Sequence, residues 1–335
     1  MRIGLSFDLK DEVILGGAEP VDDALEEYDC RETVDIIASA VESRGHSAVR
    51  LGGGRGFLKS ILNEEVDLVF NIAEGWGNYR SRESQVPAIL EMLNIPYTGS
   101  DPACLALCLD KPMTKTVVSM SGIRTPKWRV VKSVEELART SWIGFPFPAF
   151  LKPAHEGSSK GIHANSRVAT PEQLRATATL LLKNYAQPIL VEEFIEGDEV
   201  TVGLVGNSPP KVIGLMRILS KKPAGPMVYS VDVKRDWQRL VDYECPARIE
   251  KRVVVEIERA SVKAFEVLGC RDFARIDFRV TPKGTPYFLE INPLAGLGTY
   301  SDLVIMAIKS AWSHQQLICT VLDAALERYP QCVRV

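Results

Sequence analysis

The sequence predicts an α/β protein, α+β in part, that begins with an open parallel sheet. Three observations support this class. Apolar strand candidates alternate with helical patterns over the first hundred residues, as in parallel sheets. Short strands separated by Gly and Pro then follow one another from about residue 149. Finally, a predicted hairpin over 272–291 carries charged residues inside otherwise apolar strands.

The elements follow from apolar periodicity and from stop signals. In the first helix the apolar residues Val34, Ile37 and Val41 recur at helical spacing, and Gly45 ends it. The predicted strands are Met1–Phe7, Ser47–Leu51, Val66–Asn71, Ala149–Lys152, Ile189–Glu193, Val200–Val205, Lys211–Leu219, Asp272–Val280 and Pro286–Ile291. The predicted helices are Cys30–Arg44, Val86–Leu93, Pro112–Ser121, Glu250–Leu268 and Leu317–Arg328. Boundaries near residues 100 and 220 divide the chain into domains 1–100, 101–220 and 221–335.

Composition excludes several classes of function. The 335 residues are 46% hydrophobic and 25% charged, with a formal net charge of -3, so neither nucleic acid nor a membrane surface is expected as a partner. No run approaches the roughly 20 apolar residues of a membrane span, and the early Asp8 argues against a secretory signal. We therefore expect a cytoplasmic protein whose seven scattered cysteines are buried, reduced thiols. Cys104 and Cys108 share a helix face, but the sequence shows no His or second Cys pair to complete a zinc set.

A loop of small residues follows the strand that carries Lys152. It runs from Gly157 through Ser158, Ser159 and Lys160 to Gly161. Such a loop lets backbone N–H groups and hydroxyls approach an anion, and the two lysines add positive charge, which suits a polyphosphate. The loop matches neither the Walker A nor the dinucleotide-binding spacing. The alternative interpretation is a solvated hairpin loop.

The predicted C-terminal hairpin carries a candidate metal site. Period-two alternation places Arg275 and Asp277 on one face of its first strand, and Glu290 and Asn292 on one face of its second. In-register pairing would set Asp277 opposite Glu290, and carboxylate and amide oxygens suit Mg²⁺. Arg275 could then neutralise a transferring phosphoryl group or an oxyanion. The alternative is a pair of surface charges, although opposed like charges are destabilising without a cation.

Four segments, in this order, resemble the ATP-grasp superfamily and within it the D-alanine–D-alanine ligases. They are Ile95–Ser100 with Leu109–Lys111 and Lys115, Lys152-Pro153 with Glu156–Gly161, Val191–Ile195 with Glu199, and Arg275–Phe278 with Glu290–Asn292 and Gly296. The resemblance implies an ATP-grasp fold. An N-terminal pre-ATP-grasp domain would precede central and C-terminal subdomains, with ATP held between the latter two.

The resemblance also implies a role for each matching residue. The phosphates of ATP would be held or covered by Lys111, Lys152, Ser158, Ser159 and Lys234. The adenine would be framed by Glu192, Glu193 and Ile195, and the ribose would be bound by Glu199. Asp277, Glu290 and Asn292 would bind two Mg²⁺ (or Mn²⁺) ions, Arg275 and the Gly296 N–H would stabilise the tetrahedral intermediate, and Ser301 would contact the carboxylate of the amine substrate. Local alternatives are a solvated strand end for Glu192-Glu193, a surface position for Lys111 and a helix N-cap for Ser301.

The chain departs from the family where the two substrates bind. The family's glycine-rich turn and glutamate-rich stretch are replaced by 15–29, in which Glu27 lies nearest the substrate glutamate. Arg235 replaces an aromatic residue of the lid, which favours a carboxylate-rich substrate. The segment after Asn292 also differs. The resemblance thus implies retained chemistry on altered substrates.

These features predict an ATP- and Mg²⁺-dependent ligase that joins a small carboxylate to an amine through an acyl phosphate. Amino acids or related small acids are the expected substrates, and family analogy suggests a homodimer. An ATP-grasp kinase and a non-catalytic nucleotide-binding module are the alternatives. The sequence does not identify either substrate.

Overall fold

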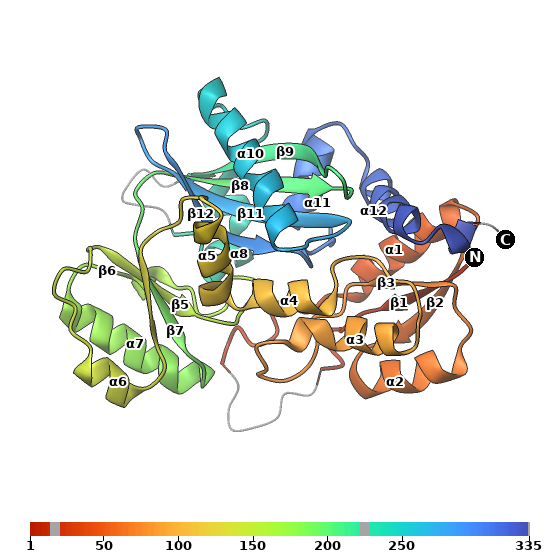
Figure 1. Ribbon diagram of the computed structural model, residues 1–335, viewed down its shortest axis with the longest axis horizontal. Coiled ribbons are helices and arrows are strands. Elements are labelled where there is room, and N and C mark those ends of the chain that lie inside the picture. The colour runs from red at the N-terminus through yellow and green to blue at the C-terminus, as the bar shows by residue number, and fades with distance from the viewer. Residues whose placement is uncertain (14–20, 222–227, 334–335) are drawn as a thin grey trace.

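The computed structural model describes residues 1–13, 21–221 and 228–333. Its framework consists of three separate β-sheets with helices packed against them (Figure 1). The first sheet is parallel and the other two are antiparallel. The mixed α/β class predicted from the sequence is confirmed.

The N-terminal sheet has three parallel strands in the order β2-β1-β3. Its strands are β1 (Arg2–Ser6), β2 (Ser47–Gly52) and β3 (Leu68–Asn71). The helices of this region are α1 (Arg31–Ser43), α2 (Gly54–Asn63) and α3 (Gln85–Met92), the last preceded by the short 3₁₀ helix η1 (Arg82–Ser84). At the carboxyl ends of β1 and β3, the Ser6 hydroxyl donates to Asn71 Oδ1 at 2.7 Å.

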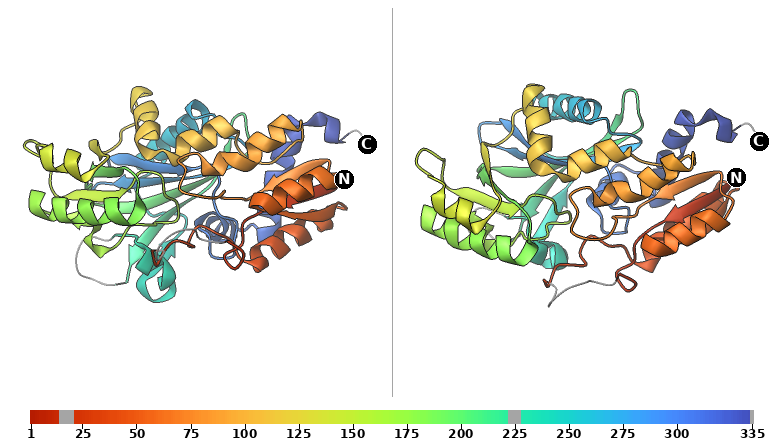
Figure 2. Two further views of the ribbon diagram at one scale, coloured as in Figure 1. Left: turned by 90° about the horizontal axis from the view of Figure 1, so that it is seen from below. Right: turned by 60° about the horizontal axis from the view of Figure 1, so that its bottom comes forward.

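The central region contains a four-stranded sheet in the order β4-β7-β5-β6. Its strands are β4 (Trp128–Val131), β5 (Ala149–Pro153), β6 (Arg167–Val168) and β7 (Ile189–Glu193). The helices α6 (Val134–Arg139) and α7 (Pro171–Tyr185) pack on one face (Figures 1 and 2). The sequence analysis did not predict α7, although its start carries a clear signal. Thr170 caps the helix by accepting from the Gln173 N–H, and a proline opens its first turn.

The third sheet has five antiparallel strands in the order β10-β9-β8-β11-β12. They are β8 (Asp198–Val205), β9 (Lys211–Ser220), β10 (Val241–Glu244), β11 (Phe273–Val280) and β12 (Pro286–Asn292). One face is covered by α4 (Pro102–Leu109), α5 (Lys111–Met120) and α10 (Lys251–Val267), and the other by α11 (Asp302–Lys309) and α12 (His314–Arg328). Two short helices, α8 (Val231–Arg235) and α9 (Trp237–Leu240), precede β10.

The hydrophobic cores show how the regions are joined. One core includes Ile3 and Leu5 of β1 together with Leu303 and Leu317 of the C-terminal helices, so the first and third sheets share a buried interior. The four-stranded sheet and its helices have a core of their own. The sheet changes between β7 and β8, whereas the predicted boundary near 220 falls at the end of β9. The division into 1–100, 101–220 and 221–335 stays a prediction.

The β11–β12 hairpin has the predicted register at its functional end, where Asp277 pairs with Glu290 and Arg275 with Asn292. A bulge follows, because Phe278 pairs with Phe288 and Leu289 is left over. Phe288 and Ile291 both face the core under α10, while Leu289 and Glu290 lie on the opposite side. A bulge re-aims side chains in this way, and here it places an apolar residue beside the carboxylate.

All seven cysteines are free thiols, but the prediction that they are buried is wrong for two, since Cys30 is exposed and Cys245 partly exposed. Cys104 Sγ lies 3.9 Å from Cys108 Sγ and 3.6 Å from Cys270 Sγ. Sequence spacing revealed only the first pair, because Cys270 comes from a distant segment. Among the helices that the structure describes, none is long and apolar enough to cross a bilayer.

Candidate active site

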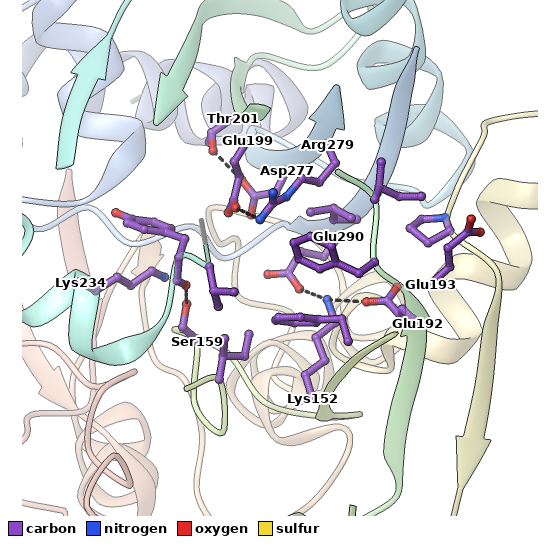
Figure 3. A pocket seen from close by; sticks show the side chains of 18 of the residues that line it. Lys152, Ser159, Glu192, Glu193, Glu199, Thr201, Lys234, Asp277, Arg279 and Glu290 are labelled. Atoms are coloured by element: carbon purple, nitrogen blue, oxygen red, sulfur yellow. Dashed lines mark hydrogen bonds and ion pairs between the residues drawn. The ribbon is translucent and has the colours of Figure 1, made fainter. Parts of the chain in front are cut away.

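A pocket lies between the four-stranded and five-stranded sheets, with side chains from β5, β7, β8, β11 and β12 in its walls (Figure 3). We call it the inter-sheet pocket. Ten residues predicted from the sequence line it: Lys152, Ser159, Glu192, Glu193, Ile195, Glu199, Lys234, Arg275, Asp277 and Glu290. They come from positions up to 138 residues apart, so the fold gathers what the sequence shows only in separate segments.

Lys152 links the two sheets across the pocket. Its Nζ lies 3.0 Å from Glu290 Oε2 on β12 and 3.3 Å from Glu192 Oε2 on β7, as Figure 3 shows. Glu192 also pairs with Lys115 at 2.5 Å. Burial alone would lower the pKa of Lys152, but Glu192 and Glu290 raise it above its usual value, so the ammonium stays charged. Glu192 is buried, which excludes the solvated strand end for that residue.

Asp277 and Glu290 face each other across the hairpin, and each has a cationic neighbour. Asp277 accepts hydrogen bonds from Arg275 Nη2 and from the Thr201 hydroxyl, both at 2.9 Å. Burial raises the pKa of Asp277, Arg275 opposes the rise, and Glu290 adds to it. Burial would also raise the pKa of Glu290, but Lys152, Lys111 and Arg275 hold it below the usual range. Asn292 completes the predicted oxygen set, with its Nδ2 3.4 Å from Asp277 Oδ2.

The far end of the pocket combines an ion pair with an apolar wall. Glu199 Oε2 accepts from Arg279 Nη2 at 3.1 Å. Burial raises the pKa of Glu199, although Arg279 opposes the shift. Phe150 and Phe194 lie beside each other with ring centroids 6.1 Å apart, and both line the pocket. A flat aromatic ligand could pack against this apolar surface, with the Glu199 carboxylate at the edge of the ligand.

The glycine-serine loop meets the segment before α8 over the pocket. Ser158 and Ser159 have φ values of 49° and 61°, so the loop turns through successive left-handed residues. The Ser159 hydroxyl donates to the Tyr229 carbonyl at 3.2 Å, and the Val231 N–H donates to the Ile162 carbonyl at 3.1 Å. These bonds join the glycine-serine loop to the segment 229–231, and together we call these two segments the joined lids.

A second, adjoining pocket continues from the first. Tyr229, Lys234, Arg275 and Asp302 line both, so they stand at the junction. Arg275 Nη1 lies 3.5 Å from Asp302 Oδ2. The predicted residues Glu27, Lys111, Ser158, Asn292, Gly296 and Ser301 line the adjoining pocket.

The local alternatives for Lys111 and Ser301 are not realised. Lys111 is buried and donates from Nζ to the Glu156 carbonyl. Ser301 occupies the N-cap position of α11, but its side chain accepts no capping hydrogen bond. Its Oγ instead lies against Gly296, where an added Cβ would come within 2.9 Å. The Ser301 hydroxyl therefore remains available to a ligand in the adjoining pocket, whereas Lys111 would have to exchange the Glu156 carbonyl for a ligand.

The predicted substrate contact of Arg235 needs correction, and that of Glu27 stays a prediction. Arg235 lines neither pocket, because its guanidinium pairs with Asp22 and Glu26, each at 2.8 Å. It links the α8 segment to the N-terminal region. Glu27 does line the adjoining pocket, but Arg82 and Lys160 hold its carboxylate at 2.7 and 3.0 Å. The glycine-bearing part of 15–29, up to residue 20, lies outside the described residues.

Sequence reasoning missed Thr201 and Asp302. Thr201 stands two residues after Glu199 on β8, so period-two alternation placed it on the pocket face and could have found it. Asp302 opens α11 and reaches Arg275 only through the tertiary fold. No local signal would have linked these two residues.

Two antiparallel sheets that enclose a pocket lined by lysines and carboxylates define an ATP-grasp architecture. Solved structures share this fold. The chain aligns with the D-alanine–D-alanine ligase of Bacillus anthracis complexed with ATP at a TM-score of 0.76, covering 99% of both chains at 20% identity. It aligns with the D-Ala:D-Ser ligase of Enterococcus faecalis at 0.74, covering 97% of this chain and 99% of that one at 22% identity.

Sequence comparison identifies the family. The model of the D-ala D-ala ligase C-terminus matches residues 115–323. A D-alanine–D-alanine ligase of Aquifex aeolicus is 32% identical over 291 residues, which cover 87% of this chain and 94% of that one. An uncharacterised protein of Sinorhizobium fredii is 34% identical over 304 residues, 88% of each chain. The chain belongs to the D-alanine–D-alanine ligase family, as the sequence predicted. This membership does not favour a kinase or a non-catalytic module.

Proposed function

We propose that this protein is an ADP-forming ligase that activates a small carboxylate with ATP and Mg²⁺ and joins it to an amine. A substrate carboxylate oxygen takes the γ-phosphoryl group of ATP, giving an acyl phosphate and ADP. The amine then attacks the acyl carbon, expels phosphate and loses a proton, leaving an amide. One observation carries the proposal: Asp277 and Glu290 oppose each other in a pocket that continues, past Arg275, into a second one.

The residues present fit Mg²⁺. Asp277, Glu290 and Asn292 offer only oxygen ligands once the Asn292 amide turns its oxygen inward, and hard divalent cations prefer such donors. Glu290 raises the pKa of Asp277, so a cation between the two opposed carboxylates would stabilise the charged form of Asp277. When bound, Mg²⁺ would neutralise charge on the phosphate oxygens.

Arg275 suits the reacting centre because it lies at the junction of the two pockets. Its pKa is raised above the usual value by Asp277 and Asp302 despite burial, so it remains a fixed positive charge. A fixed guanidinium can stabilise the charge that develops on the phosphoryl group and on the tetrahedral oxyanion. Lys234, also at the junction, and the joined lids would exclude water from the acyl phosphate.

The remaining roles follow the same pattern. The phosphates would be contacted by Lys111, Lys152, Ser158 and Ser159. The adenine would be contacted by Glu192, Glu193 and Ile195, and the ribose by Glu199. Gly296 and Ser301 would contact the tetrahedral intermediate and the second substrate. We further propose a cytoplasmic location and a homodimer, which rest on the reduced thiols and on family analogy respectively.

The test is ADP release from the purified full chain with Mg²⁺·ATP and a panel of amino-acid pairs, followed by mass spectrometry of the product. Hydroxylamine added in place of the amine should yield a hydroxamate, because it traps an acyl phosphate. A kinase acting on a hydroxyl would release ADP without hydroxamate. If no carboxylate in the panel gives either ADP or hydroxamate above background, the ligase proposal fails.

A further inference from the structure

The wall of the adjoining pocket that faces the N-terminal region is acidic. It is lined by six carboxylate residues: Glu26, Glu27, Asp29, Glu32, Glu74 and Glu83. Family chemistry assigns one glutamate near Glu27 to a substrate ammonium. In this chain the ion pairs indicate that carboxylates other than Glu27 are free to bind a ligand, and that this ligand carries more than one positive charge.

The charge of Glu27 is already balanced inside the protein. Arg82 lies 2.7 Å from Glu27 and 3.1 Å from Glu156, while Lys160 lies 3.0 and 2.5 Å from the same two carboxylates. Two cations and two anions thus form a closed, neutral and buried network. Among the described residues, Arg82 and Lys160 form ion pairs with Glu27 and Glu156 and with no other carboxylate of the wall.

Glu83 has no such partner. It is only 8% exposed, yet it lines the pocket, and its side chain makes no hydrogen bond or ion pair with any residue that the structure describes. A carboxylate buried without a partner is costly unless a ligand or a proton compensates it. Burial raises the pKa of Glu83 to about 7, with Glu27 adding to the rise and Arg82 opposing it.

Glu74 lies beside Glu83 and is likewise unpaired within the described part of the chain. The two segments are in close contact, since a Cβ on Gly75 would come within 2.0 Å of the Arg82 carbonyl oxygen. Asp8 fixes this loop by accepting from the Gly75 N–H at 2.9 Å and the Trp76 indole at 2.6 Å. Burial and the neighbouring Glu83 raise the pKa of Glu74. Two carboxylates therefore lie close enough to repel each other, and neither forms an ion pair with a described residue.

A preformed metal site does not explain this wall. Among the described His, Cys, Asp and Glu residues, only Cys104, Cys108 and Cys270 bring three ligand atoms within 4.8 Å of one another. Lys111 borders the wall, but its ammonium is bound to the Glu156 carbonyl. Burial raises the pKa of Asp29 to about 6, and a hydrogen bond with Thr33 and the charge of Lys10 only partly oppose this rise. Glu74 and Glu83 thus form no ion pair or hydrogen bond with a described side chain, although the charge of Arg82 acts on both.

We propose that this pocket binds a basic amino acid, with two positive charges received by Glu74, Glu83 and Asp29 and its carboxylate directed towards Arg275 at the junction. The α-ammonium alone would balance one carboxylate, and a side-chain ammonium or guanidinium would balance the second. The proposal rests on the ligase function for its consequence in catalysis, but the binding preference can be measured without turnover.

The binding test compares ligands of matched shape and different charge. Lysine against norleucine, and arginine against citrulline, are titrated calorimetrically into the full chain with Mg²⁺ and a non-hydrolysable ATP analogue. We expect at least one basic member to bind about tenfold or more tightly than its neutral counterpart, as charged hydrogen bonds typically contribute. Equal or weaker binding by both basic members would overturn the proposal.

Substitutions of single carboxylates test which residues cause the preference for a basic ligand. Glu83→Gln and Glu74→Gln should each reduce the preference for the basic ligand by about tenfold. Glu266→Gln, on the exposed face of α10, should leave it unchanged. Circular dichroism confirms that each variant is folded. A preference that survives both pocket variants would contradict the assignment.

Catalysis separates the two proposals. If neutral amino acids give hydroxamate as readily as basic ones, the ligase function stands and the basic-substrate inference fails. If a basic amino acid binds in preference but no acid gives ADP or hydroxamate, the subsite stands and the ligase proposal fails.

Discussion

The two pockets differ in how their charges are balanced. In the inter-sheet pocket each of the principal ionised groups has a partner within the protein: Lys152 lies between Glu192 and Glu290, Arg275 binds Asp277, and Arg279 binds Glu199. In the adjoining pocket, Glu74 and Glu83 have none among the described residues.

This difference suits the inter-sheet pocket to phosphoryl transfer and the adjoining pocket to substrate recognition. Paired charges hold one another in place before a ligand arrives, which is what phosphoryl transfer needs from its surroundings. Unpaired buried carboxylates leave part of their stabilisation to the ligand, so they select for charge. The family resemblance is strongest in the inter-sheet pocket, which we call the paired region. It is weakest in the acidic wall of the adjoining pocket, which we call the unpaired region.

The largest effect should come from breaking the paired region at its metal end. Asp277→Ala removes a proposed Mg²⁺ ligand and leaves Arg275 with only one of its two carboxylate partners, Asp302. We expect ADP release to fall by at least about 10²–10³-fold, while circular dichroism shows a folded protein. Asp242→Ala, at an exposed position on β10, serves as the control and should keep wild-type activity. Wild-type turnover by Asp277→Ala would refute the metal assignment.

Removing Lys152 should affect both stability and nucleotide binding. Lys152→Met leaves Glu192 and Glu290 facing each other in a buried site, so we expect a loss of about 3 kcal/mol in the free energy of unfolding. The KM for ATP should also rise by about tenfold or more. Urea unfolding and ADP-release kinetics measure the two effects. Lys263→Met, exposed on α10, should change neither, and an unchanged KM for Lys152→Met would argue against a phosphate contact.

The buried, unpaired carboxylate of Glu83 should make the free energy of unfolding depend on pH. Folded Glu83 has a pKa of about 7 against an ordinary value of 4.5, so the folded state binds more protons between these values. Stability then falls as pH rises from about 4.5 to 7. Glu83→Gln removes this dependence, so its free energy of unfolding should exceed that of the wild type by about 1–3 kcal/mol at pH 8 but not at pH 4, as measured by urea unfolding. A Glu83→Gln variant less stable than wild type at pH 8 would mean that the carboxylate has a partner.

The smallest effect is expected at Arg235, which joins the α8 segment to Asp22 and Glu26. The ion pairs are substantially exposed, and such pairs contribute little. Arg235→Ala should change kcat/KM for every substrate by no more than about twofold, as measured by ADP release. A selective loss of acidic substrates would instead restore the role in substrate binding that the sequence suggested.

Sequence reasoning captured the elements whose signal is local. The period-two alternation of the hairpin placed Arg275 and Asp277 on one face, and the observed register sets Asp277 opposite Glu290. The loop from Gly157 to Gly161 was identified as an anion-binding candidate for the same reason, because its small residues are adjacent. Residue order alone carries such information, since neighbours in a strand or loop cannot separate.

Only the tertiary structure decided which charges are already balanced. Glu27 meets Arg82 across 55 residues, Arg235 meets Glu26 across 209, and Cys104 meets Cys270 across 166. No periodicity reports such pairings, because they depend on how separate elements pack. Local patterns in the sequence thus predicted a phosphate and metal site, whereas the packing of the N-terminal region decided which carboxylates are paired within the protein.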